Sequence, residues 1–243
     1  MPAQSRRART RDARQDLRRM LPRPHPSDAR CCEFVLLSYP FAARRFLESQ
    51  VSICLTPDLP VYYWAHRFTN CGRMADYQYL LTKTRRFLFD SAAAPAEALS
   101  YPWPRPETVR DLAYARLLPI RQVLGQFLAR HPPAELVTGL REVIVSHGAL
   151  LAAEGAALLR WTAERLQACG AAPGFATSAL VASHPDALQL QLRYEGPSDF
   201  IWSGHLASGS ACLSADFGDT ASRLTTPISL LPPEAALADA MFF

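Results

Sequence analysis

The sequence lacks the short motifs by which many enzymes are recognised. It has only 11 glycines in 243 residues, and they form neither a Gly-x-Gly-x-x-Gly nor a Gly-x-x-x-x-Gly-Lys-Ser/Thr pattern. A phosphate-binding loop of backbone amides is therefore not indicated. A Gly-x-Ser-x-Gly elbow and a His-Glu-x-x-His helix are missing as well, and with them the signatures of the α/β-hydrolases and of many zinc proteases.

Histidine and cysteine are too scattered to suggest a metal site. No two of the six histidines are three or four residues apart, and none of the six cysteines belongs to a Cys-x-x-Cys pair. We therefore predict no metal and no cofactor. The expected state of the cysteines is a reduced, buried thiol. A redox switch built from Cys31, Cys32, Cys54 and Cys71 remains an open alternative, because thiol reactivity depends on exposure and nearby charge.

Long apolar runs are also missing. No run approaches the roughly 18 residues that indicate a membrane helix, and the N-terminus lacks the apolar core of a secretory signal. We therefore expect a cytoplasmic protein with no membrane partner.

Positive charge is concentrated at the N-terminal end of the chain. Residues 1–30 contain nine arginines and three aspartates, whereas the remainder is close to neutral. This composition, with three prolines near its end, predicts a disordered arginine-rich arm over residues 1–30. A solvated tail is the simpler interpretation. Nucleic-acid contact through the arm is the alternative, and nucleic acid is not a favoured partner.

Residues 31–133 have the pattern of an α/β domain. Apolar, β-branched and aromatic runs begin at residues 31, 61 and 85, and helical patterns separate them. The order strand, helix, strand, helix, strand predicts a parallel sheet covered by helices. A proline-rich loop over 93–107 and a long helical stretch over 106–131 follow, and Pro119 kinks that stretch or divides it into two helices.

Residues 134–243 predict a smaller α+β domain. A strand over 140–148 precedes the clearest helical pattern of the chain, which Gly170 would cap. The segment 187–196 then alternates strictly between apolar and polar residues, as a strand with one buried face does. The predicted fold class is α/β, with a parallel sheet and covering helices followed by a helix packed on a mainly antiparallel sheet.

Four segments resemble those of a known family, in the same order. "TPDLPVYYWAHR" is similar to the Pro-Asp-Leu-Pro-Val-x-x-Trp-Trp segment of the glucose-6-phosphate dehydrogenase assembly proteins, the OpcA family. "CCEFVLLSY" resembles the family's upstream Cys-Ser-Glu strand, and "RRFLFDSA" its Ile-Val-Asp-Ser-Ala strand. "DLAYARLLPIRQVLGQFL" resembles its Asp-Leu-Ala-Trp-x-Arg-Leu-x-Pro-Trp-Arg-x-Leu helix. The likeness covers residues 31–170 well and the rest loosely.

The sequence departs from this family in three places. The second Trp of Trp-Trp is Ala65, and the Trp of Pro-Trp-Arg is Ile120. Members usually carry a further strand-helix-strand unit before the Cys-Ser-Glu strand, where this chain has the arginine-rich arm. We expect either an N-terminal truncation or a wrongly chosen start codon.

The resemblance implies a non-catalytic effector rather than an enzyme. Members bind glucose-6-phosphate dehydrogenase, favour its active oligomer and raise its activity. Aromatic residues and arginine dominate interface hot spots. The candidate partner-contact residues are Asp58, Trp64, Arg67, Tyr114, Arg116 and Arg121.

Other interpretations of these residues remain open. Trp64 and Tyr114 are equally compatible with a place in the core, and Arg116 with an internal ion pair to Asp90 or Asp111. A different function is a sugar-phosphate- or nucleotide-binding enzyme on a small α/β fold, with His147 or Asp90 as acid or base. That hypothesis requires a pocket lined by His66, Asp90 and His147.

Overall fold

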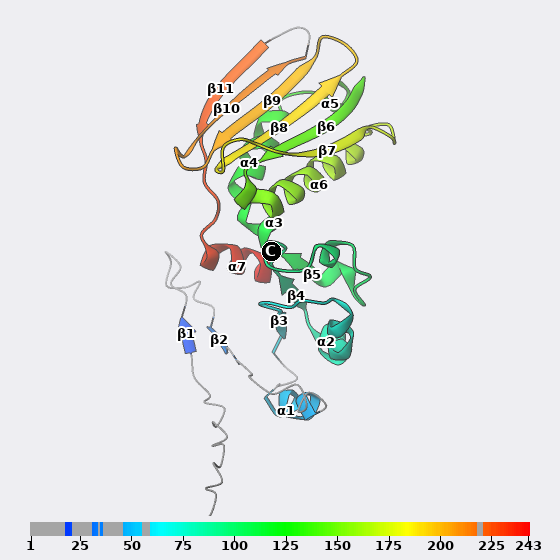
Figure 1. Cartoon of the computed structure of the whole chain (residues 1–243), viewed down its shortest axis with the longest axis vertical. Helices are drawn as coiled ribbons and strands as arrows, with labels where there is room; N and C mark the ends of the chain where they lie inside the picture. Colours follow the sequence, from blue (N-terminus) through cyan, green and yellow to red (C-terminus); the bar gives the residue numbers. More distant parts are fainter. Residues whose placement is uncertain (1–17, 21–30, 34, 36–45, 55–58, 218–220) are drawn as a thin grey trace, which may run out of the picture. The chain divides into compact units, whose positions relative to one another are not determined.

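The chain divides into two compact units, Met1–Thr56 and Pro57–Phe243, in the computed structural model (Figure 1). The described residues are 18–20, 31–33, 35, 46–54, 59–217 and 221–243. No helix within them is long and apolar enough to cross a membrane. A domain boundary after residue 133 stays a prediction.

The described part of the first unit contains two short strands and one helix. Strands β1, Arg18–Met20, and β2, Cys31–Glu33, pair antiparallel, with Arg19 opposite Cys32. Helix α1 covers Leu47–Cys54. The strand predicted to begin at Cys31 is present, but it pairs with β1, so its predicted place in the parallel sheet is wrong. The remainder of the arginine-rich arm lies outside the described residues.

A three-stranded parallel sheet opens the second unit. Its strands, in the order β3-β4-β5, are Tyr62–Trp64, Arg86–Phe89 and Val109–Asp111. The predicted parallel sheet is confirmed, with β5 as its third strand. The connection from β3 to β4 contains the 3₁₀ helix η3, Gly72–Tyr77, and helix α2, Gln78–Lys83. The chain between β4 and β5 forms two further 3₁₀ turns, η4, Ala96–Leu99, and η5, Pro106–Thr108.

Both faces of this sheet are covered, which explains why the last three residues of β4, Phe87, Leu88 and Phe89, are all apolar and buried. Phe87 and Phe89 point to the face that packs against Trp103, Met74 and Leu81. The opposite face carries Leu88, which packs against helices α3, Leu112–Arg116, and α7, Pro233–Phe242. Successive side chains of a strand alternate between faces, so one short apolar strand supplies two cores.

The long helix predicted over 106–131 is wrong at its start. Residues Val109–Asp111 form β5, and two helices follow, α3 and α4, Leu118–Leu128. Pro119 lies in the first turn of α4, where its missing amide hydrogen costs nothing. The division at Pro119 was one of the two predicted outcomes. β5 was missed because its three residues are too few to show a period of their own.

A six-stranded mixed sheet forms the rest of the second unit, in the order β11-β10-β9-β8-β6-β7. All neighbouring strands run antiparallel except β6 and β7, which are parallel because helix α6, Ala152–Ala168, crosses between them. The strands are Leu140–His147 (β6), Ala176–Val181 (β7), Ala187–Tyr194 (β8), Asp199–His205 (β9), Ser210–Asp216 (β10) and Ala221–Pro227 (β11). Helix α5, Pro133–Val137, precedes β6, and the 3₁₀ turn η6, Ala149–Leu151, leads into α6.

The helices α4 and α6 pack on this sheet (Figure 1). Leu190 lies opposite Val145 on one side and Trp202 on the other, so the three share the face toward the helices. All three are fully buried. The strict alternation predicted for residues 187–196 is confirmed in β8.

Gly170 ends α6 as the sequence predicts. Its φ is +97°, the left-handed region. The Gly170 amide donates to the carbonyl of Gln167, and the Ala171 amide donates to that of Leu166, both at 3.0 Å. This pair of bonds is the Schellman motif, which satisfies the last carbonyl groups of a helix.

Candidate functional site

The carboxyl ends of the three parallel strands bring together the polar residues that the sequence singled out. His66 follows β3, Asp90 follows β4, and Asp111 ends β5. Ligands of open α/β sheets usually bind at this edge. The edge is therefore the first place to look for a site.

Asp111 is held by three hydrogen bonds. Its Oδ1 accepts from the amides of Ser91 and Ala113, both at 3.0 Å, and its Oδ2 accepts from Ser91 Oγ at 2.8 Å. The bond from Ala113 makes Asp111 the N-cap of α3. Burial raises the pKa of Asp111, although these hydrogen bonds oppose it. Its arrangement is that of a structural carboxylate joining β4, β5 and α3.

Asp90 and Arg116 form a two-pronged ion pair. Arg116 donates from Nη1 to Asp90 Oδ2 at 2.8 Å and from Nη2 to Asp90 Oδ1 at 3.0 Å. Burial alone would raise the pKa of Asp90, but hydrogen bonds and the charge of Arg116 outweigh it and hold this pKa below its ordinary value. The internal pair of Arg116 with Asp90 that the sequence left open is therefore present.

Glu154 on α6 completes this cluster. Arg116 Nε donates to Glu154 Oε1 at 2.8 Å, and Nη2 lies 2.7 Å from the same oxygen. The Glu154 side chain is only 5% exposed, and its Oε2 has no partner among the described residues. Burial works against the charge of Arg116, yet its two carboxylate partners raise its pKa overall. One arginine thus links β4, α3 and α6, and most of its surface is turned inward.

Tyr114 and Arg121 form a second pair. The Arg121 guanidinium carbon lies 3.7 Å from the centre of the Tyr114 ring, and its Nη1 donates to the Tyr114 hydroxyl at 2.7 Å. Burial lowers the pKa of Arg121, and the tyrosine and Asp239 only partly offset this. Both side chains are half-buried, so each presents a part of its surface to solvent.

The other predicted contact residues lie around β3. Trp64 is half-buried in the cluster with α7, and its ring meets that of His66 edge-on at 5.1 Å. Its indole nitrogen is buried and has no partner in the part of the chain that the structure describes. Arg67 is exposed. Asp58 lies outside the described residues.

None of the three residues of the alternative enzyme hypothesis, His66, Asp90 and His147, lines the cavity of about 290 Å³ that is described in the next paragraph. His147 is buried at the end of β6, and its Nδ1 lies 2.9 Å from the carbonyl oxygen of Gly148, to which it donates. Its ring lies against Gly155, where an added Cβ would come within 2.6 Å of the ring. Asp90 is engaged by Arg116, and His66 is exposed.

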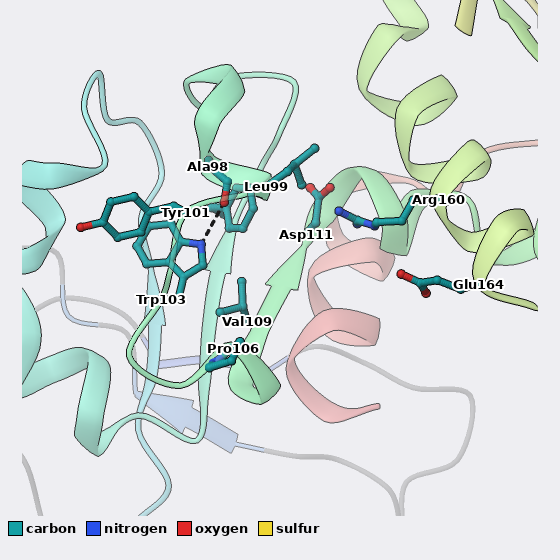
Figure 2. Close-up of a pocket in the computed structure, with 10 residues that line it drawn as sticks. Ala98, Leu99, Tyr101, Trp103, Pro106, Val109, Asp111, Arg160 and Glu164 are labelled. Atoms are coloured by element: carbon teal, nitrogen blue, oxygen red, sulfur yellow. Dashed lines mark hydrogen bonds between the residues drawn. The ribbon is translucent and has the colours of Figure 1, made fainter. Parts of the chain in front are cut away.

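A cavity of about 290 Å³ does lie beside this edge of the sheet, between the proline-rich loop and α6 (Figure 2). Its wall includes the aromatic rings of Phe89, Tyr101 and Trp103. Trp103 donates from its indole nitrogen to the carbonyl of Ala98 at 2.9 Å, which fixes the ring. The remaining lining residues are Ala98, Leu99, Pro106, Val109, Asp111, Arg160 and Glu164.

The charged residues of α6 that line the cavity were not predicted from the sequence. Arg160 and Glu164 come from the helix that the sequence predicted best, but no pattern indicates which of its exposed charges lies beside the loop. In Figure 2, Arg160 points toward Asp111 across the gap between α6 and β5. The sequence signal that could have indicated the cavity is the pair of aromatic residues, Tyr101 and Trp103, within a proline-rich loop.

Comparison with family models, with curated proteins and with solved structures finds no match to the chain. Among the described residues, no group of three or more histidine, cysteine, aspartate or glutamate side chains is placed to hold a metal ion.

Proposed function

We propose that the protein is a non-catalytic assembly factor that binds glucose-6-phosphate dehydrogenase and raises its activity. The observation that carries this proposal is the resemblance of four sequence segments, in order, to the assembly proteins of that enzyme. The proposal places the chain in the cytoplasm and in the oxidative pentose phosphate pathway, with no membrane, nucleic-acid or cofactor partner.

Two of these segments contact each other through their polar residues. Asp90 and Ser91 belong to "RRFLFDSA", and Asp111 and Arg116 belong to "DLAYARLLPIRQVLGQFL". The four residues form the ion pair and the hydrogen bonds described above. The polar residues of the two segments therefore stabilise each other, which gives their joint occurrence a physical reason without any catalytic role.

The surface that we propose for the partner adjoins these two segments. Tyr114 and Arg121 are held in a fixed arrangement yet keep part of their surface exposed, and Arg67 is free in solvent. Fixed aromatic and arginine side chains lose little conformational entropy on binding, which favours them as anchors. Arg116 contributes by holding α3, which carries Tyr114, against β4.

The mechanism that we propose is a population shift. The protein binds one conformational or oligomeric state of the dehydrogenase more tightly than the others. A coupling free energy of about 1–3 kcal/mol would change the enzyme's substrate affinity roughly 5- to 150-fold. No chemical step by this chain is required.

A dehydrogenase assay tests the proposal. The host's own glucose-6-phosphate dehydrogenase is titrated with the purified protein, and KM, kcat and oligomeric state are measured. We expect a saturable change in KM or kcat together with a shift in oligomeric state. The proposal fails if neither kinetic constant nor the oligomeric state changes at any ratio.

Single substitutions locate the surface in the same assay. Arg121→Gln removes the cation from the Tyr114 ring, and we expect the concentration for half-maximal activation to rise about tenfold. Arg165→Gln is the matched control, because Arg165 is an exposed arginine on α6. Equal effects of the two substitutions would show that Arg121 does not contact the partner. The titration with the wild-type protein still tests the activation itself.

A further inference from the structure

The cavity between the proline-rich loop and α6 combines an apolar wall with two uncommitted charges. Leu99, Tyr101 and Val109 supply the accessible apolar side, and the buried Trp103 lies behind them (Figure 2). Trp103 is rigid, because its ring packs 4.7 Å from both Phe87 and Tyr101 and its indole nitrogen is hydrogen-bonded. A preformed apolar wall with a few charged groups at one side is the usual construction of a small-molecule site.

The two charges on α6 are free to bind a ligand. Neither Arg160 nor Glu164 forms a hydrogen bond or an ion pair with any residue that the structure describes. They are four residues apart, so they lie on the same side of the helix with Cβ atoms about 5–6 Å apart. An arginine that precedes a glutamate by four residues is the weaker order for a helical ion pair. Both charges therefore remain available at a spacing that suits one small headgroup.

Asp111 lies near Arg160 but does not accept hydrogen bonds from it. Both of its oxygens already accept hydrogen bonds, from Ser91 and from Ala113. The charge of Arg160 acts to lower the pKa of Asp111, but the guanidinium donors stay unused. An anionic group entering the cavity would gain those donors, and a cationic group would gain the carboxylate of Glu164.

We propose that this cavity binds a small zwitterion with an apolar or aromatic side chain, of the amino-acid type. The carboxylate of the ligand pairs with Arg160, its ammonium group pairs with Glu164, and its side chain packs on Leu99 and Val109. A volume of about 290 Å³ lies just below the usual range of ligand pockets, which begins at roughly 300 Å³, so the ligand must be small. The inference goes beyond the proposed function, and its test needs no dehydrogenase.

Three ligands of similar shape test the charge requirement: L-phenylalanine, 3-phenylpropanoate and 2-phenylethylamine. Binding is followed by calorimetry and by the indole resonance of Trp103, assigned with a Trp103→Phe sample. We expect L-phenylalanine to bind about tenfold more tightly than either analogue, because each analogue loses one charge-assisted hydrogen bond. Equal or tighter binding of an analogue, or no binding of any of the three, overturns the proposal.

Substitutions on α6 assign the charges. Arg160→Gln should weaken the binding of L-phenylalanine and of 3-phenylpropanoate about tenfold and leave that of 2-phenylethylamine unchanged. Glu164→Gln should weaken the binding of L-phenylalanine and of 2-phenylethylamine about tenfold and leave that of 3-phenylpropanoate unchanged. Arg165→Gln is the control, because Arg165 lies on the same helix, is exposed and does not line the cavity. Thermal unfolding of each variant shows that the fold is intact. A uniform loss for all three ligands, or the same loss in the control, contradicts the assigned pairing.

Discussion

The two sheets of the second unit are built in different ways. The strands of the parallel sheet are three or four residues long, and one of the two cores beside them is rich in aromatic residues. The strands of the mixed sheet are six to eight residues long, and their core is mainly aliphatic. The short sheet depends on side chains for its stability, whereas the long sheet has an extensive ladder of backbone hydrogen bonds.

The proposed binding residues come from both regions. Trp64, Arg67, Tyr114 and Arg116 lie on a strand of the short sheet, directly after one or on α3. Arg121 lies on α4, and Glu154, Arg160 and Glu164 lie on α6, the two helices that pack on the mixed sheet. Binding residues are commonly placed on less stable segments that a rigid scaffold holds in position. The predictions below measure how far the two regions differ in stability.

The largest effect is expected at the ion cluster of the short sheet. Arg116→Met leaves Asp90 and the buried Glu154 without their cation, and removal of one partner from a buried pair costs about 3–5 kcal/mol. Urea unfolding at neutral pH measures the loss. The triple variant Arg116→Met/Asp90→Asn/Glu154→Gln should recover part of it, since no charge is then left unpaired.

An exposed pair of the mixed sheet is the control for this prediction. Arg193 lies 3.4 Å from Glu142, and its side chain is 57% exposed. Arg193→Met should cost no more than about 1 kcal/mol, as exposed ion pairs do. Similar losses for Arg116→Met and Arg193→Met would contradict the view that the first cluster organises the site.

Core truncation should next distinguish the two sheets. Leu190→Ala opens a cavity in the mixed sheet and is expected to cost about 2–5 kcal/mol. Val109→Ala, at the half-buried edge of the short sheet, is expected to cost about 1 kcal/mol. Native-state hydrogen exchange should show β8 and β9 amides exchanging only on global unfolding and β3 amides exchanging earlier. The reverse order would contradict the comparison.

A smaller effect is expected at the end of α6. Gly170→Ala forces a side chain into the left-handed region, at a cost of about 1 kcal/mol. Gly196→Ala is the matched control, because Gly196 has open space around its Cβ position and no positive φ. Thermal unfolding of both variants measures the difference, and equal melting temperatures would show that the Schellman motif adds little.

The smallest effects concern acid stability, where Asp90 and Asp111 act in opposite directions. The folded-state pKa of Asp90 is lowered, so its contribution is present above its ordinary value of 3.8 and is lost as pH falls further. Asp90→Asn should therefore flatten the decline in stability between neutral pH and pH 3. The pKa of Asp111 is raised, so its contribution is present in acid and is lost as pH rises.

Asp111→Asn should therefore make the free energy of unfolding fall more steeply as the pH is lowered. Asparagine can keep the hydrogen bonds from the two amides, so the substitution mainly removes the titration. Free energies of unfolding from urea titrations between pH 3 and 7 measure both slopes. A change of the same sign in the two variants would contradict the opposite pKa shifts.

Local patterns predicted the regular parts of the fold. The alternation in β8 and the helical period and glycine cap of α6 are visible within about ten to twenty residues of sequence. β5 was missed because it has only three residues and lies beside a helical pattern. The pairing of β2 with β1 depends on contacts that no local pattern carries.

The site was predictable only in part. Asp90 and Arg116 were both candidates, and their pairing was one of the stated alternatives. Glu154 was not named, because it joins Arg116 from a helix 38 residues further along the chain. Arg160 and Glu164 are ordinary exposed charges until the fold places α6 beside the proline-rich loop. Tertiary contacts, rather than residue types, define these members of the site.

The most direct test of the central proposal is sedimentation velocity of the host's glucose-6-phosphate dehydrogenase with and without the purified protein. We predict a faster-sedimenting complex that contains both chains and is weakened by Arg121→Gln but not by Arg165→Gln. Independent sedimentation of the two proteins at concentrations well above those in the cell would contradict the account.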